Sequence, residues 1–281
     1  MFRTAMRKLI FFINLTARLF TAVFDKKHNF VIIPLSFFGT RWLVKKKGGP
    51  WNRISLRRKT SDFQTFLQIF VFEDYRLQRL SKWVGIKEKY NEIILNGSKP
   101  LIVDCGANNG LSVLYFNLIF PESVIVAIEP EESNFEQLNR FAKKDKILCL
   151  KAAVSNENGY VQINDPGFGK WGFRVERAEQ NFSNTIPSHT VQFLIAQARK
   201  MESVVPFLIK IDIEGHEESL FSSDTEWIRL FYVLVIELHD WLIPGKANSR
   251  HFLKSISGEN RDFIYFGENI FSIQNAGQLY I

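Results

Sequence analysis

The chain is poor in cysteine, and this scarcity limits the classes of protein to which it can belong. Its 281 residues include only two, Cys105 and Cys149, each within an apolar run typical of a buried strand. Two such residues make neither a disulfide framework nor a cysteine-rich zinc site. We therefore expect both thiols to be reduced and buried, and the protein to work in the reducing cytoplasm.

A clean hydrophobic run long enough to cross a membrane is also missing. The most apolar stretch, residues 9–24, carries Arg18 in its interior, and no cleavage site of small residues follows it. Both features argue against a spanning helix or a secretory signal. On a helical wheel, Arg3, Arg7 and Arg18 share a narrow polar stripe on an otherwise apolar cylinder. This pattern predicts one of two roles for residues 1–30. They either lie on the anionic inner face of the membrane or pack against protein.

Acidic residues are scarce in residues 1–60, where the basic excess behind the formal net charge of +7 is located. The basic residues there are Arg3, Arg7, Lys8, Arg18, Lys26, Lys27, Arg41, Lys45, Lys46, Lys47, Arg53, Arg57, Arg58 and Lys59. We interpret this segment as a basic extension and residues 61–281 as the catalytic domain. No nucleic-acid recognition module accompanies the extension, and its Phe-rich apolar face suits lipid better than bases, so we expect no nucleic-acid partner.

Several chemical signatures are absent as well. No phosphate-binding loop, serine nucleophile elbow or cysteine nucleophile signature occurs. The potential metal ligands Asp212, Glu214, His216, Glu237 and His239 match no compact metal-binding motif. We therefore expect no metal site, and keep a divalent ion as the less favoured alternative.

The extension and its junction carry patterns of local structure. Apolar residues alternate around a Gly-Gly-Pro turn in residues 40–59, which predicts a basic hairpin. Ser61 and Gln64 then form a capping-box pattern before apolar residues at helical spacing. We expect one helix over about residues 62–83.

From residue 101 onward, short apolar runs alternate with helical segments, as in a parallel sheet with crossover helices. The predicted strands are 101–105, 124–128, 147–153, 207–213 and 231–238; the predicted helices include 111–120 and 133–143, the second opened by a capping box from Ser133 to Glu136. Residues 263–266 and 270–273 predict a closing antiparallel hairpin. The fold class is therefore α/β, with a Rossmann-like sheet covered by helices on both faces.

The sequence LIVDCGANNGL places Asp104, Gly106, Asn108 and Gly110 where the first strand gives way to a helix. Glycines allow a tight turn and close approach to a ligand, and a helix start offers free N–H groups. A dinucleotide or S-adenosylmethionine fits such a turn. An acidic residue is poorly placed beside a pyrophosphate, whereas it suits the cationic sulfonium and ammonium of S-adenosylmethionine.

Acidic residues also follow the later strands. Glu129, at the end of the second strand, is placed to accept hydrogen bonds from ribose hydroxyls. The fourth strand, FLIKIDIEGHE, alternates so that Lys210, Asp212 and Glu214 share one side. A buried lysine among carboxylates indicates an ion-pair network or a site. The fifth strand ends near Glu237 and His239, and His239 is a candidate general base.

These pieces together resemble the FkbM family of S-adenosylmethionine-dependent methyltransferases. The matching segments run in the family's order over about residues 61–240: SDFQTFLQIFVFEDY, VDCGANNG, IEPEESNF, KAAVS, LIKIDIEGHE and VIELH. The resemblance implies a class I methyltransferase fold, S-adenosylmethionine as cofactor, and O-methylation, often of sugar hydroxyls in glycans, glycolipids or secondary metabolites. The chain departs from the family at Cys105, where a small or β-branched residue is usual, and at His216, where Ala is frequent.

We therefore expect Asp104, Gly106, Asn108, Gly110, Glu129 and Asp212 to bind the cofactor, and Lys210, Asp212, Glu214 and His239 to serve catalysis. Either Asp212 or His239 would take the proton of an acceptor hydroxyl while the methyl group transfers in line. Phe168, Trp171 and Phe173 would either stack on the acceptor or fill the core. The alternatives are a membrane-associated scaffold without turnover and an NAD-linked oxidoreductase, which Asn108 disfavours. The acceptor's identity and the oligomeric state stay open.

Overall fold

The protein is described by a computed structural model over residues 28–35, 40–141, 146–164, 174–177 and 185–275. The amphipathic helix predicted in residues 1–24 and the predicted aromatic face of Phe168, Trp171 and Phe173 lie outside the described residues. The chain divides into two compact units, which we call the N-terminal unit, Met1–Asp74, and the main unit, Tyr75–Ile281. The domain division at residue 60 stays a prediction, since compactness alone does not show independent folding.

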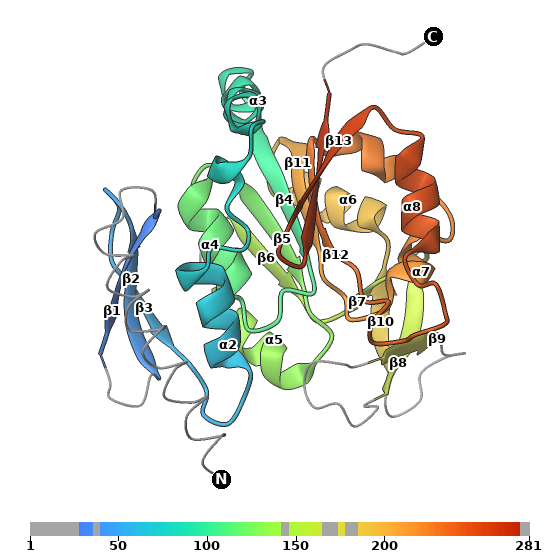
Figure 1. Cartoon of the computed structure of the whole chain (residues 1–281), viewed down its shortest axis with the longest axis horizontal. Coiled ribbons are helices and arrows are strands. Elements are labelled where there is room, and N and C mark those ends of the chain that lie inside the picture. Colours follow the sequence, from blue (N-terminus) through green and yellow to red (C-terminus); the bar gives the residue numbers. More distant parts are fainter. Residues whose placement is uncertain (1–27, 36–39, 142–145, 165–173, 178–184, 276–281) are drawn as a thin grey trace. The chain divides into compact units, whose positions relative to one another are not determined.

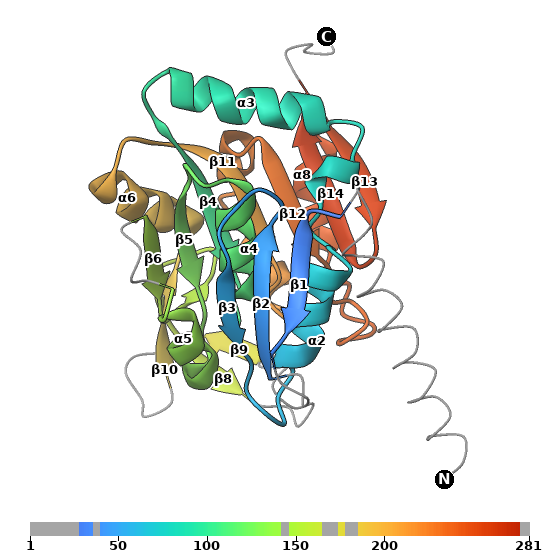
Figure 2. The ribbon, with the colours of Figure 1, turned by 90° about the vertical axis from the view of Figure 1, so that its left-hand side faces the viewer.

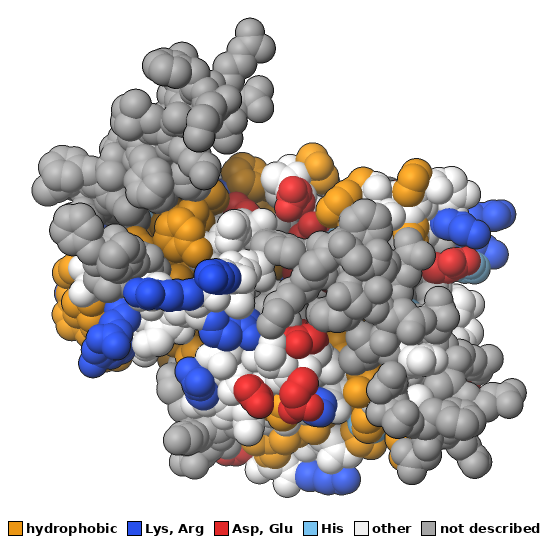
Figure 3. All heavy atoms as spheres, turned by 90° about the horizontal axis from the view of Figure 1, so that it is seen from below, with side chains coloured by type: hydrophobic (Ala, Val, Ile, Leu, Met, Phe, Trp, Pro, Cys, Tyr) orange, Lys and Arg blue, Asp and Glu red, His pale blue; other side chains and the backbone are white. Residues whose placement is uncertain are grey.

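The N-terminal unit contains a three-stranded antiparallel sheet in the order β1-β2-β3 (Figure 2). Its strands are β1 (Phe30–Pro34), β2 (Arg41–Lys46) and β3 (Asn52–Ser55). β2 and β3 form the predicted hairpin, because their alternating residues place Trp42, Val44 and Ile54 on a buried face. Arg41 and Arg53 lie on the exposed face, and Lys and Arg side chains gather with hydrophobic ones on this part of the surface (Figure 3).

The predicted helix over residues 62–83 is wrong in its length. The chain forms α2 (Asp62–Phe66) and a π-helical turn (Leu67–Val71), and the helical path ends before Glu73, whose φ is +52°. The nearly buried Glu73 carboxylate accepts the backbone N–H of Asn29, so a tertiary contact and not the apolar spacing decides where the helix stops. A 3-10 turn (Leu77–Arg79) and α3 (Trp83–Leu95) follow.

Ser61 is the N-cap residue of α2 as predicted, but its side chain makes no capping hydrogen bond, so the predicted capping box is wrong. The first turn of α2 is held by Asp62 instead. Its carboxylate accepts the backbone N–H of Arg57 at 2.8 Å and pairs with the guanidinium of Arg57 at 2.8 Å. Within the unit's core, Trp42 stacks on Phe66 with ring centroids 4.7 Å apart. Aromatic packing thus joins the sheet to α2.

The main unit is built on a seven-stranded sheet in the order β13-β14-β12-β11-β4-β5-β6 (Figure 1). The parallel strands are β6 (Ile147–Leu150), β5 (Val124–Ile128), β4 (Lys99–Cys105), β11 (Val204–Ile211) and β12 (Val233–Glu237); the predicted closing hairpin is β13 (Arg261–Phe266) and β14 (Asn269–Gln274), with β14 antiparallel to β12. The predicted α/β fold class is confirmed. Because the chain passes from β4 to β5 on one side and returns through β11 on the other, the strand order switches between β4 and β11, where such sheets bind ligands.

Helices cover both faces of this sheet (Figure 1). α3 and α4 (Leu111–Ile119) lie on one face, and α6 (Val191–Met201), α7 (Glu217–Phe221) and α8 (Arg250–Ser257) lie on the other. Alternation along β4 sends Leu101 and Val103 into the core that α6, α7 and α8 share. It sends Asp104 toward α4, whose Ser112 hydroxyl donates to the Asp104 carboxylate at 2.6 Å.

Three local predictions need correction. The helix expected over residues 133–143 is α5 (Glu132–Leu138), and its N-cap is Glu131, whose carboxylate accepts the N–H of Asn134 and the hydroxyl of Ser133. Ser133 therefore donates a hydrogen bond to the N-cap residue and is not the N-cap itself. The strand expected over residues 147–153 is split into β6 and β7 (Ala153–Val154). Cys105 is buried and free as predicted, whereas Cys149 is free but only half-buried.

The second half of that split run joins a small sheet in the order β7-β10-β8-β9. Its other strands are β10 (Thr185–His189), β8 (Gly159–Asn164) and β9 (Arg174–Arg177). A further 3-10 turn spans Glu226–Leu230. Among the helices of the described residues, none has both the length and the apolar character needed to span a membrane.

Candidate active site

The loop after β4 lies against the end of β11, and Gly106 makes this approach possible. Gly106 has a φ of +77°, and a Cβ there would lie 1.8 Å from the backbone oxygen of Asp212. No side chain fits in that space, so this backbone arrangement requires glycine at position 106. The turn therefore brings the carboxyl ends of β4 and β11 together.

Lys210 joins these two strand ends from within. Its ammonium donates to the backbone oxygen of Gly106 at 2.6 Å and lies 3.2 Å from Oδ1 of Asp104 and 3.4 Å from Oδ2 of Asp212. Burial alone would lower the pKa of Lys210, but its interactions with Asp104, Tyr75 and Asp212 together outweigh burial and hold the pKa well above its usual value. Lys210 thus stays protonated and acts as a fixed positive charge.

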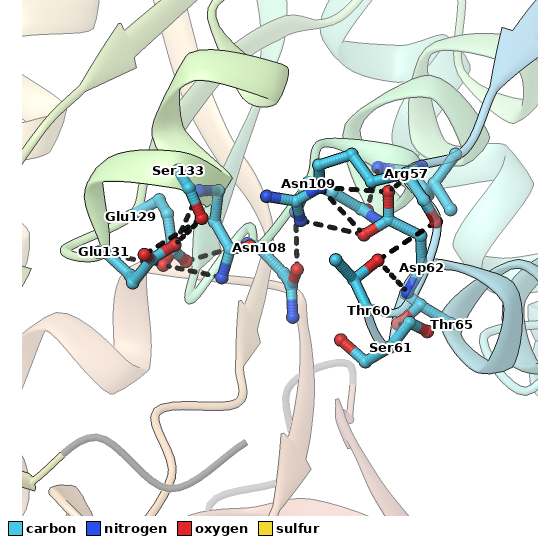
Figure 4. A network of polar contacts seen from close by, with 12 residues as sticks. Arg57, Thr60, Ser61, Asp62, Thr65, Asn108, Asn109, Glu129, Glu131 and Ser133 are labelled. Carbon is cyan, nitrogen blue, oxygen red and sulfur yellow. Dashed lines mark hydrogen bonds and ion pairs between the residues drawn. The ribbon is translucent and has the colours of Figure 1, made fainter. Parts of the chain in front are cut away.

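Glu129, directly after β5, holds the loop from the other side (Figure 4). Its carboxylate accepts the N–H of Asn108 at 2.8 Å through Oε2 and the N–H of Glu131 at 3.0 Å through Oε1. The side chain is nearly buried, and this burial raises the pKa of Glu129 to about 7 although the hydrogen bonds act to lower it. Asn108 adopts a left-handed φ of +49° in this arrangement.

A cleft opens between this loop and the ends of β5 and β11. Five predicted site residues line it: Gly106, Asn108, Glu129, Asp212 and Glu214. Its apolar wall includes Ile128, Ala152 and Val154. The cleft therefore combines an apolar surface with carboxylates at two ends.

Two residues predicted to bind the cofactor lie elsewhere. Asp104 is fully buried beneath the loop, bonded to Ser112 and paired with Lys210, so it can influence the cleft only through those partners and Gly106. Gly110 precedes α4, where a Cβ would lie 2.6 Å from the ring of Phe141. Gly110 thus permits packing and does not line the cleft.

His239 does not line the cleft itself but lies beside its lining residues Asp212 and Glu214, among four carboxylates. Its Nδ1 is 2.7 Å from Oε1 of Glu217, and its Nε2 is 3.6 Å from Oδ1 of Asp212, 3.6 Å from Oε2 of Glu214 and 3.5 Å from Oε1 of Glu237. The imidazole is only 1% exposed. The predicted catalytic residues Lys210, Asp212, Glu214 and His239 therefore form one connected group.

The charges in this group shift the proton equilibria of its members. Burial alone lowers the pKa of His239, yet hydrogen bonds to Glu217 and Glu237 and the charge of Asp212 raise it to about 11. Burial, and then the charge of Asp212, raise the pKa of Glu214 to about 8. An imidazole that holds its proton at neutral pH has no lone pair with which to act as a base. In this arrangement Asp212 is the better candidate for that role.

Sequence analysis gave no role to two residues that orient His239. Glu217, in α7, is fully buried and accepts a hydrogen bond from Nδ2 of Asn248 while it contacts the imidazole. Glu217 was visible as part of the acidic fourth-strand segment, but nothing in the periodicity placed it under His239. Asn248 carries no sequence signal, because its contact is set entirely by the tertiary fold.

A second, larger cavity adjoins the cleft, and His216 lines both. The second cavity has a volume of about 610 Å³, within the usual range for small-molecule sites. Its walls are rich in hydroxyl and amide groups: Ser155, Asn156, Ser188, Ser219 and Ser222, together with Tyr160. The Asn156 amide donates to the hydroxyls of Ser222 at 3.0 Å and Ser223 at 3.1 Å, so this polar wall is internally ordered.

The model of the "Methyltransferase FkbM domain" matches residues 104–265, more than half of the chain. No curated protein matches the chain. Among solved structures, the chain is similar to a fibrillarin/Nop5p complex (16% identity, 68% of this chain and 81% of that chain covered, TM-score 0.35). It is also similar to a putative caffeoyl-CoA O-methyltransferase from Staphylococcus aureus (13% identity, 75% and 91% covered, TM-score 0.35). These two likenesses are too distant to carry an argument.

The buried ion pair yields a prediction about stability. We expect Lys210→Met to lower the free energy of unfolding by about 3 to 5 kcal/mol, because the Asp104 carboxylate then stays buried without its cation. Adding Asp104→Asn should restore part of the loss. Equilibrium unfolding in guanidinium chloride measures the free energy of unfolding of both variants. The control is Lys254→Met at an exposed position, which should change that free energy by less than about 0.5 kcal/mol. A Lys210→Met loss no larger than that of the control contradicts the pairing.

Proposed function

Because the chain belongs to the FkbM family of S-adenosylmethionine-dependent methyltransferases, we propose that it methylates a hydroxyl oxygen of a sugar in a glycan, glycolipid or secondary metabolite. The observation that supports this acceptor is the polar cavity lined by Ser155, Asn156 and Tyr160, which shares His216 with the cleft. Hydroxyls and amides suit a ligand rich in hydroxyl groups. S-adenosylmethionine is the cofactor.

The cleft fits this cofactor by the chemistry of its walls. Glu129 offers carboxylate oxygens to ribose hydroxyls, as acidic residues at the second strand do in nucleotide-binding sheets. Ile128, Ala152 and Val154 offer an apolar surface for the adenine ring. Asp212 offers negative charge to the cationic end. The cofactor, when bound, supplies a methyl group on a positively charged sulfur, which is already activated for transfer.

The chain's own contribution is alignment and removal of one proton. The acceptor hydroxyl oxygen must approach the methyl carbon in line, within about 3 to 3.5 Å, and positioning of this kind supplies much of the rate. As the new C–O bond forms, the hydroxyl proton must leave. We assign its acceptance to the carboxylate of Asp212, which is partly exposed at the cleft, whereas Lys210 and His239 hold protons. Lys210 positions Asp212 through their ion pair.

The proton-accepting role predicts a selective loss in Asp212→Asn. We expect the transfer rate to fall by about 10² to 10⁴-fold, the usual contribution of a general base. Affinity for S-adenosylhomocysteine, which lacks the sulfonium charge that Asp212 would face, should change little when measured by calorimetry. Transfer of labelled methyl groups is measured on a panel of sugars, phenols and peptides.

The matched control is Asp262→Asn on the edge strand β13, which pairs with Lys82 away from the cleft. It should keep full transfer. Unchanged turnover in Asp212→Asn would remove the proposed base. Transfer by the unaltered protein to phenols or peptides, but to no sugar, would contradict the proposed acceptor class.

The raised pKa of Glu129 predicts a pH dependence of cofactor binding. The ionised carboxylate accepts ribose hydrogen bonds, and it is lost as the pH falls through about 7. Affinity for S-adenosylhomocysteine should therefore decline from pH 8 to pH 6, by about tenfold per unit below the pKa if only the ionised form binds. Glu129→Gln should bind more weakly and lose this dependence. Parallel pH profiles for the two proteins would show that Glu129 does not contact the ribose.

We further propose that the protein binds peripherally to anionic membranes through residues 1–30, aided by the basic sheet. Residues 28–60 contain no acidic side chain. On the sheet, Trp51 is 43% exposed with the Lys45 ammonium 4.6 Å from its ring centroid, and Ile33 is also exposed. Aromatic and basic side chains together are typical of interfacial binding. A lipid-linked sugar acceptor would accord with both proposals.

Charge reversal tests this membrane contact. Each Lys or Arg near an anionic surface contributes about 1 kcal/mol, so the triple variant Arg3→Glu, Arg7→Glu, Arg18→Glu should bind phosphatidylglycerol vesicles on the order of a hundredfold more weakly. Vesicle sedimentation measures binding, with neutral phosphatidylcholine vesicles and Lys200→Glu as controls. Equal partitioning of the variant and the unaltered chain would exclude a contact through residues 1–30.

A further inference from the structure

We propose that Asp212, Glu214 and His239, at the ends of β11 and β12, form a binding site for one divalent transition-metal ion. One candidate ligand atom from each residue lies within 4.8 Å of the others. Glu237, whose Oε1 is 3.5 Å from Nε2 of His239, faces the same point. Metal–ligand bonds of about 2.0 to 2.2 Å place neighbouring ligand atoms about 3 to 3.5 Å apart. Small side-chain adjustments bring this group to that spacing.

The imidazole of His239 gives independent support. The ring is buried, and its Nε2 faces three carboxylates but has none closer than 3.5 Å. Its Nδ1 is held at 2.7 Å by Glu217, which Asn248 fixes in turn. Metal-bound histidines are characteristically oriented in this way, with the second nitrogen on a carboxylate. The ring is thus aimed at the acidic group by two buried partners.

The charge balance also favours a cation. Lys210 neutralises Asp104 from inside the sheet, and the remaining carboxyl groups of Asp212, Glu214, Glu217 and Glu237 surround a single imidazole. Close carboxylates at partly buried positions repel one another unless a cation lies between them. A divalent ion supplies that charge and takes the place of the proton on Nε2 of His239, which the imidazole holds when no ion is bound. One imidazole with several carboxylates suits Mn²⁺, Fe²⁺ or Zn²⁺ better than Mg²⁺, which favours all-oxygen sites.

This inference rests on the proposed function for its role and deepens it. An ion beside Asp212 lies at the acidic end of the cleft, where the acceptor hydroxyl would arrive. Coordination of a hydroxyl to a divalent ion makes its proton easier to remove and fixes the oxygen in place. A carboxylate has two oxygens, so Asp212 can hold the ion through one and take the proton at the other.

Mn²⁺ is the probe, added to the full chain after treatment with a chelator. Loss of the free-ion signal in electron paramagnetic resonance, together with calorimetry, gives stoichiometry and affinity. We expect one ion per chain and a nitrogen coupling from His239 in the pulsed spectrum. Glu214→Gln should weaken binding at least tenfold, and Glu217→Gln should weaken it by about 10 to 100-fold, as changes behind a metal ligand do.

Glu226→Gln, an exposed acid in a 3-10 turn, is the matched control and should bind Mn²⁺ as the unaltered chain does. An unchanged circular dichroism spectrum and thermal unfolding midpoint show that Glu214→Gln is folded. No stoichiometric Mn²⁺ binding, binding that Glu214→Gln leaves intact, or a bound ion without nitrogen coupling each overturns the site. Mn²⁺ binding without methylation of any sugar would uphold the site and count against the acceptor proposed above.

Discussion

The buried ammonium of Lys210 is the interaction on which the candidate site depends. It lies where β4 and β11 run side by side and connects Asp104, Asp212 and the backbone oxygen of Gly106. A buried charge of this kind is tolerated only when its partners are close and well directed. The same constraint that stabilises the ion pair therefore fixes the loop and the carboxylate to which we assign the cofactor and the acceptor. Because the methyl group of a sulfonium is already activated, transfer requires mainly alignment of the reacting atoms. We propose that the fixed strand ends provide this alignment.

From this fixed centre the cleft divides into two ends with different chemistry. At one end, the Glu129 carboxylate accepts the backbone N–H groups of Asn108 and Glu131 and lies beside apolar residues. This arrangement suits a nucleoside. At the other end, Asp212 and Glu214 line the cleft, and Nε2 of His239 lies 3.6 Å from a carboxylate oxygen of each. The polar cavity that shares His216 with the cleft is where we propose that the acceptor binds. In the proposed mechanism, the methyl donor and the acceptor hydroxyl therefore meet next to Asp212.

Much of this arrangement could be predicted from sequence, because the strongest signals are local. Apolar runs located the strands of the main sheet, and the turn at Gly106 and the acid at Glu129 stood at strand ends, where parallel sheets place ligands. Predictions failed where a distant partner decides the local structure. Glu73 ends a helix by binding the backbone near β1, and Glu131 replaces the expected cap of α5. Likewise, the clamp of Glu217 and Asn248 on His239, which removes the imidazole as a base, depends on three separate segments that only the fold brings together.

The central claim is that the cofactor lies between Glu129 and Asp212, with its reactive end toward the acidic group. A crystal structure of the full chain with S-adenosylhomocysteine tests it most directly. We predict ribose hydroxyls within hydrogen-bond distance of the Glu129 carboxylate, adenine against Ile128, and the sulfur next to Asp212. A nucleoside bound elsewhere, or a sulfur directed away from Asp212 and the cavity beyond His216, would contradict the account.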